Sequence, residues 1–71
     1  MKTVIDLHGV KHADVPRIIE NACSQHEIPF IVITGKSDMM KKIVEKAASE
    51  FNLLIRDVVN NPGRILVYES G

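Results

Sequence analysis

The chain has only one cysteine, Cys23, among its 71 residues. A single thiol excludes an internal disulfide and gives no support for a thiolate metal site, so we expect a protein of a reducing compartment, the cytoplasm. Neither positive nor negative charge is in excess, because nine Lys and Arg residues balance nine Asp and Glu residues. The field of the whole molecule therefore cannot attract a polyanion, and nucleic-acid binding requires a local cluster of positive side chains.

Long apolar runs, linkers, repeats and low-complexity segments are absent from the sequence. No run approaches the length of a membrane-spanning helix, and Asp6 follows the start too closely for the apolar core of a signal peptide. We therefore expect neither export nor a membrane partner. A chain of this size has room for one small domain that buries about 60% of its unfolded surface. We expect a monomer with a single domain over residues 1–71.

The first part of the chain predicts a strand followed by a helix. Residues 3–7 are rich in β-branched side chains, which favours a strand. Apolar residues then recur with helical spacing from Val15, and His26 falls on the same stripe. Pro16 is tolerated only in the first turn, so this helix should begin near residues 12–14.

The same order of patterns returns in the middle of the chain. Within residues 30–34, apolar side chains occupy odd and even positions alike, so both faces of a strand here would be apolar. This predicts a central strand buried on both sides. A second apolar stripe with helical spacing runs from Met40 to Phe51, and Ser37 or Asp38 is suited to cap the start of this helix.

Two further strand-like runs, residues 53–59 and 64–69, predict an antiparallel hairpin. Asn60, Asn61, Pro62 and Gly63 join them and supply turn geometry, with the glycine available where a positive φ is needed. The order β-α-β-α-β-β predicts an α/β fold. A right-handed crossover then places both helices on one face of the sheet and leaves the other face partly open.

Asp6 and His8 form the first candidate site. They lie two positions apart at a strand end, so they share a face with their Cα atoms about 7 Å apart. The carboxylate can orient the imidazole, which exchanges protons near neutral pH. A capping or hydrogen-bonding pair is the commoner use of such a pattern, so the residues alone leave both roles open.

Thr34, Gly35, Lys36 and Ser37 form the second candidate site. Glycine lets the backbone approach a ligand, the following N–H groups lie at a helix N-terminus and the lysine adds a positive charge, which together suit a phosphate. A plain strand-to-helix turn explains the same residues equally well. A Walker A nucleotide site is excluded, because Phe30 stands where that motif requires glycine.

Positive charge gathers around these two loops, at Lys11, Lys36, Lys41 and Lys42. The cluster would attract a polyanion, although a solvated helix face accounts equally well for the lysines within the second helix. His8 and His12 lack a third ligand, so no metal site is predicted.

The Ile5-Asp6-Leu7-His8-Gly9 segment, followed by Thr34-Gly35-Lys36, resembles the motifs of the Smr (small MutS-related) domain family, and the resemblance extends over essentially the whole chain. It implies a two-layer α/β sandwich with a four-stranded mixed sheet, similar to the C-terminal domain of bacterial translation initiation factor three. The last strand would lie antiparallel inside that sheet. The chain departs from the family at Ser37, where a second glycine is usual, and at Asp38, whose carboxylate should weaken anion binding unless it turns away.

The resemblance also implies nucleic-acid binding and an endonuclease that acts on RNA or DNA, with RNA the favoured partner and the ribosome a further candidate. Asp6 and His8 would be catalytic. Cleavage by these residues would not require a cofactor, although a divalent ion bound to Asp6 stays open. The residues expected to bind substrate phosphate are Gly9, Thr34, Gly35, Lys36, Ser37 and Lys41. The alternatives are a non-catalytic module that docks onto RNA, the ribosome or a protein, and a small regulatory protein that retains the fold without the chemistry.

Overall fold

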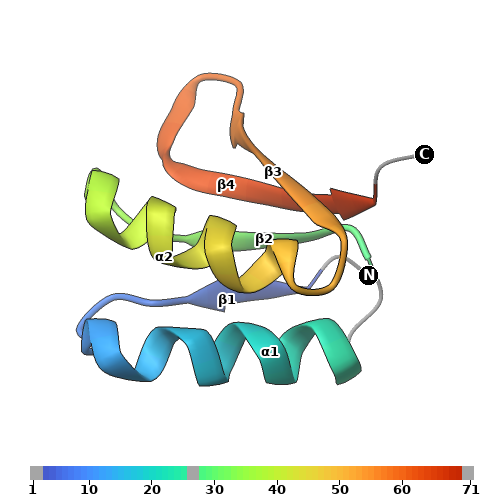
Figure 1. The fold of residues 1–71 in the computed structure, drawn as a ribbon. Coiled ribbons are helices and arrows are strands. Elements are labelled where there is room, and N and C mark those ends of the chain that lie inside the picture. The colour runs from blue at the N-terminus through green and yellow to red at the C-terminus, as the bar shows by residue number, and fades with distance from the viewer. Residues whose placement is uncertain (1–2, 26–27, 70–71) are drawn as a thin grey trace.

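A computed structural model describes residues 3–25 and 28–69. Two helices and four strands follow one another in the predicted order (Figure 1). The elements are β1 (Val4–Asp6), a 3-10 turn η1 (His12–Asp14), α1 (Val15–Gln25), β2 (Phe30–Ile33), α2 (Asp38–Ser49), β3 (Leu53–Val58) and β4 (Asn61–Glu69). Pro16 is the second residue of α1, which confirms its place in the first turn.

The four strands form one mixed sheet in the order β1-β2-β4-β3. β1 and β2 are parallel, whereas β4 is antiparallel to both of its neighbours, β2 and β3. Both helices cover one face, so the structure is a two-layer α/β sandwich, as predicted (Figure 1). The predicted hairpin is confirmed, and β4 lies inside the sheet.

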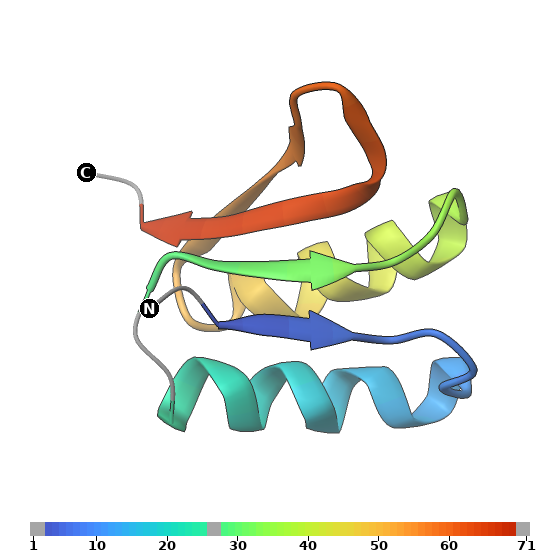
Figure 2. The ribbon, with the colours of Figure 1, turned by 180° about the vertical axis from the view of Figure 1, so that it is seen from behind.

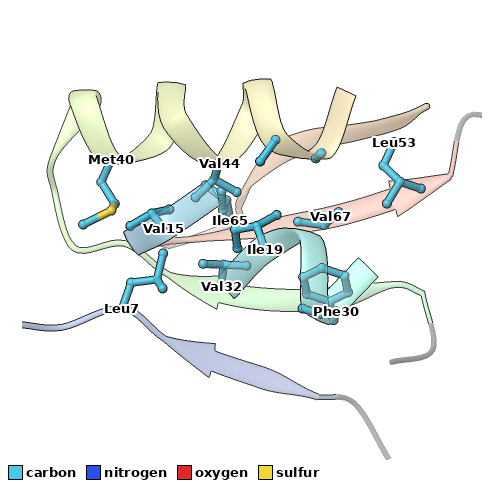
Figure 3. Close-up of a cluster of buried hydrophobic side chains, with 13 residues drawn as sticks. Leu7, Val15, Ile19, Phe30, Val32, Met40, Val44, Leu53, Ile65 and Val67 are labelled. Carbon is cyan, nitrogen blue, oxygen red and sulfur yellow. The ribbon is translucent and has the colours of Figure 1, made fainter. Parts of the chain in front are cut away.

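The core lies between the helices and one face of the sheet (Figure 3). Strand residues alternate in burial, so that every second side chain of β2 and β4 reaches this layer. The helices contribute the stripes predicted from their apolar spacing. The largest fully buried side chains are those of Leu7, Val15, Ile19, Phe30, Val32, Val44, Ile65 and Val67.

Several details differ from the predictions. Ile31 and Ile33 are only half-buried, because no helix covers the second face of β2. Phe51 lies beyond the end of α2 and is 40% exposed, since Asn52 adopts a φ of 60° and turns the chain toward β3. The hairpin turn is shorter than predicted, because Asn61, Pro62 and Gly63 already belong to β4, and the positive φ falls on Asn60 and not on Gly63. The predicted position of His26 lies outside the described residues.

None of the helices within residues 3–25 and 28–69 combines the length and the apolar character needed to cross a membrane. The longest of them, α2, has 12 residues and exposes Lys42 and Lys46.

Met39 and Met40 offer a matched test of the packing between α2 and the sheet. Met40 is 6% exposed and belongs to the core, whereas Met39 is 58% exposed. Met40→Ala should lower the free energy of unfolding by about 2 to 5 kcal/mol, because it removes buried atoms and leaves a cavity. Met39→Ala should change it by less than about 0.5 kcal/mol. Urea unfolding followed by circular dichroism measures both, and equal losses would contradict the placement of α2.

Candidate functional site

The loops after β1 and β2 leave the sheet at the same end (Figure 2). β1 and β2 are parallel neighbours with Asp6 opposite Ile33, and the Leu7 N–H donates to the Ile33 carbonyl at 3.0 Å. The side chains that follow, including His8 and Lys36, therefore start from one edge of the molecule. We call this end of the sheet, formed by residues 6–11 and 34–37, the loop edge.

Asp6 fixes the turn that presents His8. One carboxylate oxygen, Oδ1, accepts a hydrogen bond of 2.8 Å from the backbone N–H of His8. The N–H of Val10 donates to the carbonyl of Leu7 at 3.0 Å, and Gly9 has a φ of 78°, as the third residue of a type II turn requires. Asp6 therefore contacts the backbone of His8, and the imidazole itself is exposed.

Thr34 and Gly35 attach the second loop to β4. Both of their N–H groups donate to the carbonyl of Gly63, at 2.9 and 3.0 Å. The Thr34 hydroxyl is buried and donates to the Gly35 carbonyl at 2.9 Å. Thr34 and Gly35 were expected to bind phosphate, but the Thr34 hydroxyl and the Gly35 N–H donate to carbonyl groups of the protein itself. A Cβ added at Gly63 would lie 3.5 Å from Gly35 Cα, which shows how closely the two segments approach.

Ser37, one of the two residues predicted to cap α2, is its N-cap. Its hydroxyl oxygen accepts a hydrogen bond of 3.1 Å from the N–H of Met40. Asp38 is the first residue of the helix, where the helix dipole favours a carboxylate. Lys36 is exposed, and its ammonium forms no ion pair with the residues that the structure describes. Lys36 therefore remains accessible to an anion.

Lys41, another residue predicted to bind phosphate, forms an ion pair with Asp57. Its ammonium nitrogen lies 3.4 Å from Asp57 Oδ1, so that the pair connects α2 with β3. The lysine side chain is mostly buried while the aspartate is mostly exposed, and water weakens such a pair. With its charge matched by Asp57, Lys41 is a weaker candidate for phosphate binding than Lys36.

The sequence did not single out Arg64, which strand pairing places beside the loop edge. Arg64 lies opposite Ile33, the last residue of β2, and Ile33 lies opposite Asp6. Because Ile65 is buried on the helix side, Arg64 extends from the other face of the sheet. Positive charge at this end of the sheet therefore comes from Lys11, Lys36 and Arg64.

Metal and thiol chemistry find little support in the described residues. Between residues 3–25 and 28–69 no three His, Cys, Asp or Glu side chains gather in a group that could hold a metal ion. Burial, with a smaller effect from the Glu20 carboxylate, raises the pKa of the Cys23 thiol. A protonated thiol is a poor nucleophile, so Cys23 serves as a packing residue at the edge of the core.

Comparisons with protein-family models, with curated proteins and with solved structures return no match. The resemblance to the Smr domain family therefore depends on the two motifs and on the order of the elements.

Gly9 and Gly63 provide a matched test of the turn at the loop edge. Gly9 has a φ of 78° and open space where a Cβ would lie, so Gly9→Ala should lower the free energy of unfolding by about 1 to 2 kcal/mol through backbone strain alone. Gly63 has no such φ, and an added methyl group would make an ordinary contact, so Gly63→Ala should change stability by less than about 0.5 kcal/mol. Chemical denaturation measures both. A Gly9→Ala variant as stable as the parent would contradict the type II turn.

Proposed function

We propose that this chain is an Smr-like domain that binds nucleic acid at the loop edge and cleaves a phosphodiester of RNA there. One observation supports the proposal above the others: an exposed imidazole, His8, and an exposed ammonium, Lys36, follow neighbouring parallel strands at the same edge. The proposed compartment is the cytoplasm, with the ribosome as a candidate partner.

Phosphate binding rests on side-chain charge. Lys36 would contact the scissile phosphate, and the N–H groups of Lys36 and Ser37 have no acceptor among the described residues. Lys11 and Arg64 would hold the neighbouring phosphates of the strand. Since the chain as a whole is neutral, binding should depend on these few local contacts and weaken as salt is added.

Cleavage would require proton transfer at a phosphate. His8 would accept the proton of the ribose 2′-hydroxyl as the 2′-oxygen attacks phosphorus. The bond from phosphorus to the 5′-oxygen then breaks, and the departing oxygen takes a proton from water. Lys36 would offset the negative charge that develops on the phosphate oxygens. Asp6 would act as a positioning residue, since it holds the backbone of His8.

His8 and His12 give the sharpest test of the catalytic role. Both are exposed, but His12 lines the groove between α1 and α2 together with Pro16 and Ile43. His8→Ala should reduce cleavage of an end-labelled structured RNA by about 100-fold or more, because general acid–base catalysis contributes that much. His12→Ala should cleave at the parental rate. A supercoiled plasmid tested in parallel reports any nicking of DNA, and cleavage that survives in His8→Ala would refute the mechanism.

Asp6 can be tested by a variant that keeps its hydrogen bond. Asp6→Asn retains a side-chain oxygen for the His8 N–H but removes the charge, whereas Asp6→Ala removes both. If Asp6 acts by positioning, Asp6→Asn should retain most of the cleavage rate, and Asp6→Ala should lose at least about tenfold with RNA binding unchanged. Single-turnover cleavage and fluorescence anisotropy separate rate from binding. Equal losses in the two variants would assign the role to the charge.

A second function, docking onto RNA without cleavage, is favoured because Asp6 and Gly35 form hydrogen bonds within the fold. The Asp6 carboxylate holds a backbone N–H, and the N–H of Gly35 is donated to Gly63, so neither group is reserved for chemistry. A module that docks onto RNA without cleaving it needs only the exposed cations. RNA binding without cleavage by the parental protein, unchanged in His8→Ala, would establish this function in place of the first.

A further inference from the structure

The helices leave one face of the sheet uncovered (Figure 2), and strand pairing places a continuous set of side chains on it. Val4 and Leu54 on this face are 48% and 46% exposed, and the apolar residues between them are half-buried. We call this surface the open face. Its members alternate along each strand with the residues that face the helices, and they are Val4, Asp6, Ile31, Ile33, Leu54, Arg56, Arg64, Leu66 and Tyr68.

Strand register arranges these residues in rows across the sheet. Val4 pairs with Ile31, Ile31 with Leu66, and Leu66 with Arg56, which makes an apolar row that ends in a cation. The neighbouring row, toward the loop edge, runs from Asp6 through Ile33 to Arg64. Tyr68 and Leu54 form the row on the far side.

The acidic and basic residues of β3 and β4 lie on opposite faces of the sheet. Asp57 lies on the helix side, where it pairs with Lys41, and Glu69 lines a hollow there with Cys23 and Phe51. The open face keeps the two arginines, Arg56 and Arg64. Its one carboxylate, Asp6, already accepts the N–H of His8. The open face is therefore positively charged although the chain is neutral.

An aromatic ring and a guanidinium lie together on this face. Arg56 Cζ is 6.0 Å from the centroid of the half-buried Tyr68 ring. Aromatic rings and arginine planes on an exposed sheet are surfaces on which unstacked nucleic-acid bases stack. Double-stranded RNA presents no such bases, so these two residues favour a single strand.

We infer that the open face binds single-stranded RNA, with a base stacked on Tyr68 and Arg56 and a phosphate held by Arg64. Tyr68 and Arg64 are four positions apart on β4, a path of about 13 Å that ends beside the loop edge. The strand would then continue to His8 and Lys36. The inference rests on the proposed RNA binding and deepens it, because it specifies a single-stranded substrate.

A second copy of the chain is a poorer match for the same surface. Two copies packed face to face about a two-fold axis would bring four arginines together with only two carboxylates, each already hydrogen-bonded to a backbone N–H. Charge complementarity thus favours the polyanion.

The test uses Tyr68 and Phe51, an exposed aromatic residue on the helix side. Fluorescence anisotropy in a His8→Ala background measures binding of a labelled single-stranded RNA, its duplex, and the single-stranded DNA of the same sequence at low salt. Tyr68→Ala should weaken binding of the single-stranded RNA by about 5- to 100-fold, the usual effect of losing one base stack. Tyr68→Phe and Phe51→Ala should bind within about twofold of the background protein, with folding checked by circular dichroism.

The outcomes separate this inference from the proposed function. Equal binding by Tyr68→Ala, or a duplex bound as tightly as the single strand, would overturn the open-face site while leaving binding at the loop edge in place. Single-stranded DNA bound better than RNA would overturn the choice of RNA. No binding of any nucleic acid would overturn both proposals. A dimer in light scattering that Tyr68→Ala dissociates would assign the open face to a second copy.

Discussion

The hydrogen bond from the Leu7 N–H to the Ile33 carbonyl ends the parallel pairing of β1 with β2, and the arrangement of the loop edge depends on it. The register behind this bond is set by burial, because Leu7 belongs to the core and a shift of one residue would turn it to the open face. The same shift would move Asp6 to the other face of the sheet. The hydrophobic core therefore determines where the polar groups of the first loop lie.

The carbonyl of Gly63 adds a second constraint at the same edge. By accepting from both Thr34 and Gly35, it holds the β3–β4 hairpin against the second loop and brings Arg64 beside Ile33. The arrangement has a chemical consequence, since a backbone N–H that donates to Gly63 is lost to a phosphate. The proposed phosphate binding would therefore depend on the side chains of Lys36 and Arg64 more than on the N–H groups of Thr34 and Gly35.

Local patterns were sufficient to predict the order of the elements and most of the core. The spacing of apolar residues placed Val44 and Ala47 on the buried side of α2, and the capping role of Ser37 followed from its position before the helix. The end of α2 was missed because it depends on the positive φ of Asn52. Spacing placed Asp6 near His8, but it did not reveal that the carboxylate binds the backbone N–H.

The remaining features of the site depend on pairing between distant segments, which periodicity does not encode. Arg64 reaches the loop edge only through the register of β4 against β2, and Asp57 meets Lys41 only because β3 lies beside α2. That pairing also divides the charges of β3 and β4, with Asp57 and Glu69 on the helix side and Arg56 and Arg64 on the open face. The row from Asp6 to Arg64 belongs to the open face and borders the loop edge, so the two positive surfaces adjoin. A flexible polyanion can contact both at once, and each contact raises the effective concentration of the strand at the other.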